Sequence, residues 1–317
     1  MIPRSGTSSA TSGPSRPRPR ASSGATVLRY LALWLAIRAG RWVPAGALYA
    51  AARAGARLAW ATSPGLRSVT RDHMRHVLGI AAEEAAVDRA ARGAVRSAAL
   101  YYADLARYSH LDPETSFAEV ESYEGVEHLF EAWDRGCGVV MVSAHLGNPE
   151  MIVQALGPFG IAPMVLTEPL APRRLHDLVH GVRQHTGVPF VPVDRAGMRR
   201  AVAHLRSGGA LAILADRDVM GSGRPVPFFG ERALMPHGAV ELARRTGAAL
   251  VTGFVYRRGV GRYRIVMEPA LPIPRTDDRA GDTREGMRLL LARLERGIHA
   301  APEQWFALAP VWRRIPR

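Results

Sequence analysis

The sequence contains no lysine, a single cysteine and no acidic residue before Asp72. One cysteine cannot form a disulfide framework, so the fold must depend on its packed core. All 42 basic residues are therefore arginine, and the formal net charge is +14. Because everything before Asp72 is cationic or neutral, we expect this part of the chain to be attracted to anionic surfaces such as phospholipid headgroups.

Long hydrophobic runs are also missing. Between residues 26 and 62 the longest uncharged stretch, from Trp42 to Ala52, is far shorter than the roughly 20 residues of a spanning helix. Arginines are mixed there with aromatic residues such as Tyr49 and Trp60, which suits helices lying in the plane of a membrane interface. A helical pair packed on the core is the alternative interpretation.

The domain organisation follows from these changes in composition. Residues 1 to 25 are rich in Ser, Pro, Gly and Arg, and we expect a disordered basic tail because they bury almost nothing apolar. Residues 26 to 110 are expected to form a helical, membrane-associating region. Residues 111 to 317 are expected to form an α/β core, with 26 to 317 as one structural unit.

Signatures of several other function classes are absent. The sequence has no zinc-finger spacing, no basic strand interleaved with aromatic residues and no helix-turn-helix pattern, so we expect no nucleic-acid partner. It has no Gly-x-Ser-x-Gly motif, so a serine hydrolase nucleophile has no obvious position. His176 and His180 have metal-ligand spacing, but Asp177 replaces the glutamate of the HExxH motif and no third ligand is evident, so we expect no metal.

Strand and helix patterns alternate through the C-terminal two-thirds of the chain. This alternation predicts an α/β fold with a largely parallel central sheet covered by helices. Functional residues gather at the carboxyl ends of the strands in such sheets. The predicted strands are GVVMVSAH, APMVLTE, VPFVPV, ALAILAD, ALVTGFVYR and GRYRIVMEPAL, separated by predicted helices, and a helix from Asp282 to Ala300 ends the domain.

His145, in the segment VSAHLGNPE, stands where the first of these strands ends. Asn148 and Pro149 then form a favourable helix start with Glu150 in the first turn. A carboxylate could hold one ring nitrogen of His145 while the other takes a proton from a hydroxyl. Free N–H groups at this helix start could stabilise an oxyanion, although Glu150 is also what a helix N-terminus favours on its own.

Further candidate residues follow the neighbouring strands. Asp216 and Asp218 end the strand ALAILAD and should share the rim of His145, so either could replace Glu150 as its carboxylate partner. Glu168 ends APMVLTE, and Arg183 on the next helix could bind a phosphate group. The segment from Gly221 to Gly230 is expected to be a mobile loop that walls a lipid site, and we place Phe228, Phe229 and Glu231 of the FFGE segment among the substrate-binding residues. The alternative is a solvated turn whose phenylalanines pack in the core.

Six ordered blocks resemble the bacterial late acyltransferases, the family of lipid A lauroyl and myristoyl acyltransferases and of phosphatidylinositol mannoside acyltransferases. The resemblance runs from roughly Arg71 to Trp312. The LADRD and FFGE segments and the all-arginine composition are closer to the mannoside enzymes, whereas Pro149 replaces an aromatic residue usual in the family. The blocks are HLGNPE, a helix ending VRQHTG, LADRD, PVPFFGERALMP, GAVELARRTGAAL and PEQWFALAPVW.

The resemblance implies that His145 is a general base and Glu150 the acidic member of its motif. It places Glu168 and Arg183 near the active site and gives Asp216 and Asp218 as the acidic strand end. It also implies an enzyme on the cytoplasmic face of the plasma membrane, peripheral or monotopic, which uses acyl-CoA or acyl carrier protein as thioester donor and needs no other cofactor.

We therefore expect an acyltransferase that moves a fatty acyl group from acyl-CoA to a hydroxyl of a membrane glycolipid, most like phosphatidylinositol mannoside. The expected partners are an anionic membrane surface, the thioester donor and the glycolipid acceptor. Two alternatives stay open: a lipid A late acyltransferase that uses acyl carrier protein or acyl-CoA, and a non-enzymatic glycolipid-binding module at the membrane surface.

Overall fold

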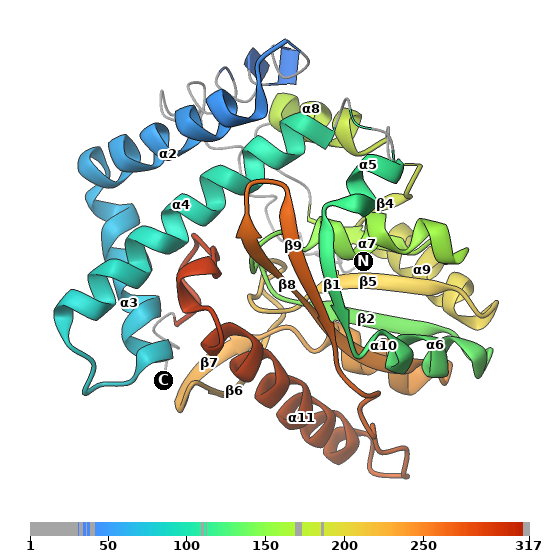
Figure 1. The fold of residues 1–317 in the computed structure, drawn as a ribbon. Coiled ribbons are helices and arrows are strands. Elements are labelled where there is room, and N and C mark those ends of the chain that lie inside the picture. Colours follow the sequence, from blue (N-terminus) through green and yellow to red (C-terminus); the bar gives the residue numbers. More distant parts are fainter. Residues whose placement is uncertain are drawn as a thin grey trace, which may run out of the picture.

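The computed structural model describes residues 31, 34–35, 37–38, 42–108, 111, 113–168, 173–184 and 187–312. The tail expected over residues 1 to 25 lies outside these ranges. The expected α/β fold is confirmed: a seven-stranded sheet has the order β1-β9-β8-β2-β5-β3-β4, with helices on both of its faces (Figure 1). The strands are β1 (Val120–Glu124), β2 (Val139–Ser143), β3 (Met164–Thr167), β4 (Phe190–Pro192), β5 (Ala210–Leu214), β6 (Arg224–Phe228), β7 (Glu231–Met235), β8 (Ala249–Gly259) and β9 (Arg262–Met267).

The helices fall where the sequence pattern predicted them, apart from the short α5. They are α2 (Ala45–Thr62), α3 (Pro64–Leu78), α4 (Glu84–Tyr108), α5 (Pro113–Ala118), α6 (Val126–Asp134), α7 (Glu150–Ala155), α8 (Arg173–Gln184), α9 (Arg195–Arg206), α10 (Gly238–Thr246) and α11 (Arg279–His299), with 3₁₀ turns η1 (Gly157–Phe159) and η2 (Pro302–Gln304).

The sheet is parallel in its centre and reverses at one edge. Strands β8, β2, β5, β3 and β4 are parallel to one another, whereas β9 is antiparallel to β8 and pairs in parallel with β1. The sequence prediction missed β1, because VESYE is charged, short and only partly buried, as suits an edge strand. The carboxyl ends of β2, β5, β3 and β8 therefore all meet at one edge.

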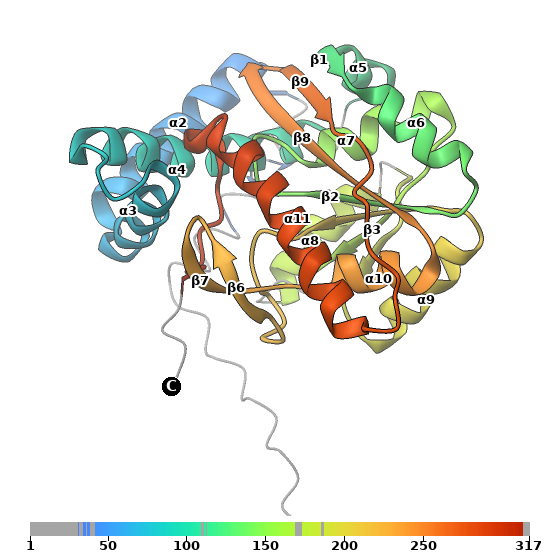
Figure 2. The ribbon, with the colours of Figure 1, turned by 90° about the horizontal axis from the view of Figure 1, so that it is seen from below.

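Residues of β2 alternate between two apolar layers. Val139 and Met141 pack with the layer of α6 and α7, whereas Val140 and Val142 pack with the layer of α9, α10 and α11. Figure 2 shows these two groups of helices on opposite faces of the sheet. Because both faces are covered, every residue of β2 is buried, which explains the unbroken apolar run in its sequence.

The N-terminal helices pack beside the sheet (Figure 1). Helix α2 lies on α4, where Leu48 and Tyr49 contact Leu100 and neighbouring alanines. Of the aromatic residues considered for the interface, Tyr49 is fully buried, whereas the residue Trp42 is 76% exposed. Among the described residues, no helix combines the length and the apolar character that crossing a bilayer would require.

Gly297 of α11 allows this helix to lie directly on β8. A Cβ at this position would come within 2.3 to 2.7 Å of three ring atoms of Phe254, which is itself buried. Gly297→Ala is therefore expected to lower the free energy of unfolding by about 1–3 kcal/mol through overpacking. Gly55→Ala in α2 is the control, since a Cβ there meets nothing within 4 Å; it should be neutral or stabilising by up to about 1 kcal/mol. Urea unfolding measures both, and equal stability of the two variants would contradict the packing argument.

His73 of α3 makes stability depend on pH. Its side chain is buried and accepts the Val311 N–H at 3.2 Å through Nε2. Burial, helped by the nearby His76, lowers the pKa of His73 from 6.5 to about 4. As the pH falls, the unfolded chain therefore binds a proton at His73 at a higher pH than the folded chain does. Its contribution is fully present above about pH 6.5 and is lost as the pH falls towards about 4, by up to about 1.4 kcal/mol per pH unit.

His73→Gln should flatten this dependence, because the amide does not titrate and its Oε1 can still accept from Val311. Urea unfolding between about pH 4.5 and 7 gives the slope, to which other histidines also contribute. A slope unchanged by the substitution would show that His73 is not the buried group that titrates.

Candidate active site

His145 and Asp216 meet at the carboxyl ends of two adjacent parallel strands. Ser143, the last residue of β2, is in register with Leu214, the last of β5. The two chains stay together beyond the strands, because the Ala215 N–H donates to the Ser143 carbonyl at 3.0 Å. His145 Nδ1 then lies 2.8 Å from Asp216 Oδ1. Of the three carboxylates considered as its partner, Asp216 is the one that contacts His145.

Asp216 receives two further hydrogen bonds. Its Oδ2 accepts from the backbone N–H of His145 at 3.0 Å and from Trp305 Nε1 at 2.7 Å. Burial alone would raise the pKa of this fully buried carboxyl, but the charge and hydrogen bonds of His145 and the indole of Trp305 outweigh it, and the pKa lies well below its usual value. Asp216 is therefore an ionised acceptor, which holds the imidazolium by charge. When the imidazole is neutral, its Nδ1–H points to Asp216 and Nε2 is left to take a proton.

The backbone around His145 is held by the C-terminal segment. Phe306 N–H donates to the His145 carbonyl at 2.8 Å, and Gly147 N–H donates to the Gln304 carbonyl at 3.1 Å. Gly147 has a φ of 60°, and a Cβ there would lie 2.0 Å from the Val255 carbonyl oxygen. The turn after β2 therefore needs glycine both for its conformation and for its close contact with β8.

Glu150 lies in the first turn of α7, as expected, but its carboxylate has partners other than His145. Its Oε1 accepts from Arg183 Nη2 at 2.6 Å, from Arg183 Nε at 3.0 Å and from the Tyr101 hydroxyl. Burial alone would lower the pKa of Arg183, but Glu150 and Tyr101 outweigh it and hold the pKa above its usual value. Arg183 also lies over the ring of Phe190. Glu150 and Arg183, two candidates from different parts of the sequence, are thus a buried ion pair beside the dyad.

The start of α7 is tied to α4 through Asn148. Asn148 Oδ1 accepts from the Glu150 N–H at 3.2 Å, and its Nδ2 donates to Asp104 Oδ2 at 2.9 Å. The Met151 N–H donates to the Asn148 carbonyl. The N–H groups of Glu150 and Met151 are thus bonded to Asn148, so these two are not among the free donors that were expected at this helix start.

Asp104 of α4 joins two further elements, α2 and β8, to this turn. The carboxylate is completely buried and accepts from Arg257 at the end of β8 and from the Tyr49 hydroxyl of α2, as well as from Asn148. The sequence analysis missed Asp104, because its position within a long amphipathic helix gives no sign of a polar function.

Asp218 and Glu168 lie near the dyad with other partners. Asp218 accepts the N–H groups of Ser222 and Gly223 at 3.3 and 2.9 Å and so fixes the turn that follows β5. Glu168, just after β3, forms an ion pair with Arg217 at 2.6 Å. Both acids line the same cavity as His145, so the predicted shared rim is observed.

Phe228, Phe229 and Glu231 occupy a different place from the one expected. The predicted loop is a β-hairpin of β6 and β7, in which Phe228 is fully buried and stacks on Trp312. Phe229 packs near Trp305, and Glu231 faces His76 at 3.2 Å. None of the three lines the His145 cavity. The expectation of a lipid-covering loop is therefore corrected: these aromatic rings pack in the core behind the dyad.

The cavity beside His145 has a volume of about 730 Å³. This is within the usual range of sites for small organic ligands. Its polar lining includes His145, Glu168, Arg183, Arg217 and Asp218, and no cluster of three His, Cys, Asp or Glu that could hold a metal occurs in the described part of the chain. The apolar lining, which the sequence did not reveal as one surface, comes from Met141, Ile152, Val153, Val165, Leu166, Met198, Leu214, Leu242, Met267 and Phe306.

The chain matches the family model described as bacterial lipid A biosynthesis acyltransferase over residues 18–314. It is 29% identical over 307 residues to a phosphatidylinositol mannoside acyltransferase of Mycobacterium tuberculosis, an alignment that covers 94% of this chain and 92% of the relative. The enzyme of the same name from Mycolicibacterium smegmatis is 29% identical over 294 residues, covering 90% and 91%. Among solved structures, the 1-acyl-sn-glycerophosphate acyltransferase of Thermotoga maritima aligns with a TM-score of 0.34 and 12% identity over 63% of this chain and 82% of that one.

The family match spans nearly the whole described fold, including the dyad, the Glu150–Arg183 pair and the cavity. The chain is thus an acyltransferase and belongs to the bacterial lipid A biosynthesis acyltransferase family.

Proposed function

We propose that the protein transfers a fatty acyl group from acyl-CoA to a hydroxyl of a membrane glycolipid of the phosphatidylinositol mannoside type, with His145 as general base. The observation that carries the proposal is the His145–Asp216 dyad at the edge of a cavity with many apolar lining residues. The names of the relatives from two mycobacterial species support the acceptor class.

The geometry supports direct attack by the acceptor hydroxyl on the thioester. The hydroxyl donates to Nε2 of neutral His145, and its proton passes to the ring as the new C–O bond forms. The ionised Asp216 stabilises the resulting imidazolium through Nδ1–H. When the tetrahedral intermediate collapses, the C–S bond breaks and the leaving thiolate takes the proton from His145. The products are an ester and a free thiol, and the base is regenerated.

The apolar lining is suited to the acyl tail. Burial of a methylene group stabilises binding by about 0.8 kcal/mol, so the tail would supply much of the affinity for the donor. Met141, Ile152 and Met267 are among the side chains available for this contact. The ion pair of Glu168 and Arg217 on the same lining would face the polar parts of donor and acceptor.

We further propose that the protein works at the cytoplasmic face of the plasma membrane as a peripheral or monotopic enzyme. Two features support this: the cationic N-terminal part of the sequence and exposed apolar side chains on the N-terminal helices, such as Leu35 and Leu58. An anionic membrane surface would bring the enzyme to its lipid acceptor.

Substitutions of His145 and Asp216 can be compared with a substitution of Asp218, a carboxylate of the same cavity that does not bond His145. His145→Ala and Asp216→Asn should each lower kcat about 10²- to 10⁴-fold, because the base or its orientation is lost. Asp218→Asn should have a smaller effect, since Asp218 bonds a turn and not His145. Purified protein receives acyl-CoA and mannosylated phosphatidylinositol, and mass spectrometry follows the acylated lipid. His128→Ala, on α6, is the control for loss of a histidine, and wild-type turnover by His145→Ala would refute the mechanism.

Glu150 should behave differently from Asp216. Glu150→Gln leaves the buried charge of Arg183 without its counterion, which typically costs about 3–5 kcal/mol of stability. We expect a clear fall in the urea midpoint and a smaller loss of kcat than in Asp216→Asn. Glu84→Gln, which removes a carboxylate from an exposed ion pair, should leave the midpoint near that of the wild type. If Glu150→Gln kept full stability but lost kcat as Asp216→Asn does, Glu150 would act in the reaction and not only as the counterion of Arg183.

A further inference from the structure

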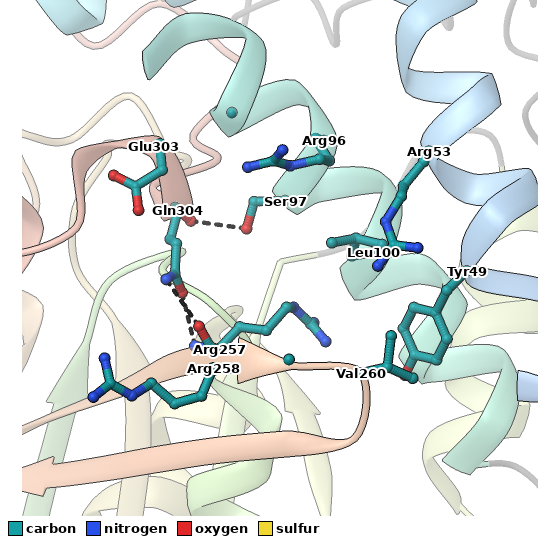
Figure 3. A pocket seen from close by; sticks show the side chains of 12 residues that line it. Tyr49, Arg53, Arg96, Ser97, Leu100, Arg257, Arg258, Val260, Glu303 and Gln304 are labelled. Atoms are coloured by element: carbon teal, nitrogen blue, oxygen red, sulfur yellow. Dashed lines mark hydrogen bonds between the residues drawn. The ribbon is translucent and has the colours of Figure 1, made fainter. Parts of the chain in front are cut away.

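A second, smaller cavity lies at the same edge of the sheet as His145 but shares no lining residue with the first cavity. Its volume is about 200 Å³, and its walls come from α2, α4, the end of β8 and η2 (Figure 3). Four arginines line it: Arg53 of α2, Arg96 of α4, and Arg257 and Arg258 of β8. These residues come from segments that lie far apart in the sequence, and only the fold places them around one cavity.

The positive charge of this pocket is only partly compensated. Arg257 is paired with Asp104. Among the described residues, no carboxylate oxygen lies within 4.0 Å of a guanidinium nitrogen of Arg53, Arg96 or Arg258. Glu303 is the one acidic residue of the lining. An excess of guanidinium groups around a concave space favours an anion.

The wall of the pocket is held in place by short contacts. Gln304 Oε1 accepts from the Arg257 N–H at 2.7 Å, and its Nε2 donates to the Arg257 carbonyl at 3.1 Å. Ser97 donates to the Gln304 carbonyl at 3.1 Å. A Cβ on Gly93 would lie 2.4 Å from Glu303 Cβ, so α4 and η2 are in direct contact. In Arg257 itself, Nε is buried and has no acceptor among the described residues.

We propose that this pocket binds a phosphate group. The planar fork of an arginine matches phosphate oxygens with paired hydrogen bonds, and Arg53 and Arg96 reach the space from two different helices. The volume is below the range of about 300–1,000 Å³ typical for whole small ligands, which suits one charged group of a larger molecule. Two sources share this chemistry: the headgroup phosphate of a phospholipid, and the phosphates of the nucleotide in a thioester donor.

The pocket lies close to the turn that carries His145. The Gln304 carbonyl, which accepts from Ser97 in the pocket wall, also accepts from Gly147, two residues after His145. The site is nevertheless separate from the acyl-transfer chemistry, and its ligand binding is measured without turnover. Failure of the phosphate site and failure of the proposed function are therefore distinguishable.

The experiment compares two double variants of the full chain that lose the same charge. Arg53→Ala/Arg96→Ala removes two pocket arginines, whereas Arg57→Ala/Arg89→Ala removes exposed arginines of the same two helices that do not line the pocket. Binding to phosphatidylcholine vesicles with and without phosphatidylinositol is measured by flotation. Binding of CoA and of inorganic phosphate is measured by calorimetry. Arg53→Lys/Arg96→Lys keeps the charge without the fork, and thermal unfolding checks that every variant is folded.

The pocket variant should bind at least tenfold more weakly in one arm, and the control variant should change less than threefold. The lysine variant should fall between the wild type and the alanine variant. Loss in the vesicle arm identifies a lipid headgroup as the source, and loss in the CoA arm identifies the donor nucleotide. Equal weakening by pocket and control variants would mean diffuse surface charge, and unchanged binding in all arms would mean no phosphate site; either result overturns the proposal.

Discussion

The buried carboxylate of Asp216 is the interaction on which the site depends. A fully buried charge is stable only when hydrogen bonds and an opposite charge replace its water. Asp216 obtains these from the His145 backbone, the His145 ring and the Trp305 indole. Three separate segments, after β2, after β5 and after η2, must therefore meet at one point. The position of His145 at the cavity follows from that requirement.

A second buried carboxylate, Asp104, makes the N-terminal helices part of the same arrangement. It joins Tyr49 of α2, Arg257 of β8 and Asn148 of the turn that carries His145. The contacts across the predicted boundary near residue 110 are thus polar, buried and specific. Displacement of α2 or α4 would therefore change the surroundings of Asn148 and of the turn that carries His145.

The sequence predicted the fold well where a local pattern carries the information. Apolar runs such as GVVMVSA and the helical periodicities fixed most elements, and the end of a strand marked His145, Asp216, Asp218 and Glu168 as neighbours. The β6–β7 hairpin was missed, since prolines and glycines in its sequence favour a loop. Its phenylalanines then found a place against Trp305 and Trp312 that only the tertiary structure defines.

The choice of carboxylate could not be predicted from spacing. Glu150 is close to His145 in sequence, but α7 turns its side chain towards Arg183, whereas Asp216 is brought in by the parallel pairing of β2 with β5. For the same reason Trp305, the apolar cavity lining and the cluster of Arg53, Arg96 and Arg258 had no signal along the chain. Each consists of residues from distant segments that meet at one edge of the sheet.

The arginines fall into two groups: some pair with buried carboxylates of the fold, and others line the second cavity. Arg183 and Arg257 are buried and each has a carboxylate, Glu150 and Asp104, so their charge is used within the fold. Replacing one partner of such a pair leaves the other charge buried without compensation, which strongly destabilises the fold. Arg53 of α2 and Arg96 of α4, at the second cavity, form no ion pair with a carboxylate of the described residues. Both side chains are exposed, so their charge costs little desolvation free energy. Their guanidinium groups can therefore bind an anion from outside the chain.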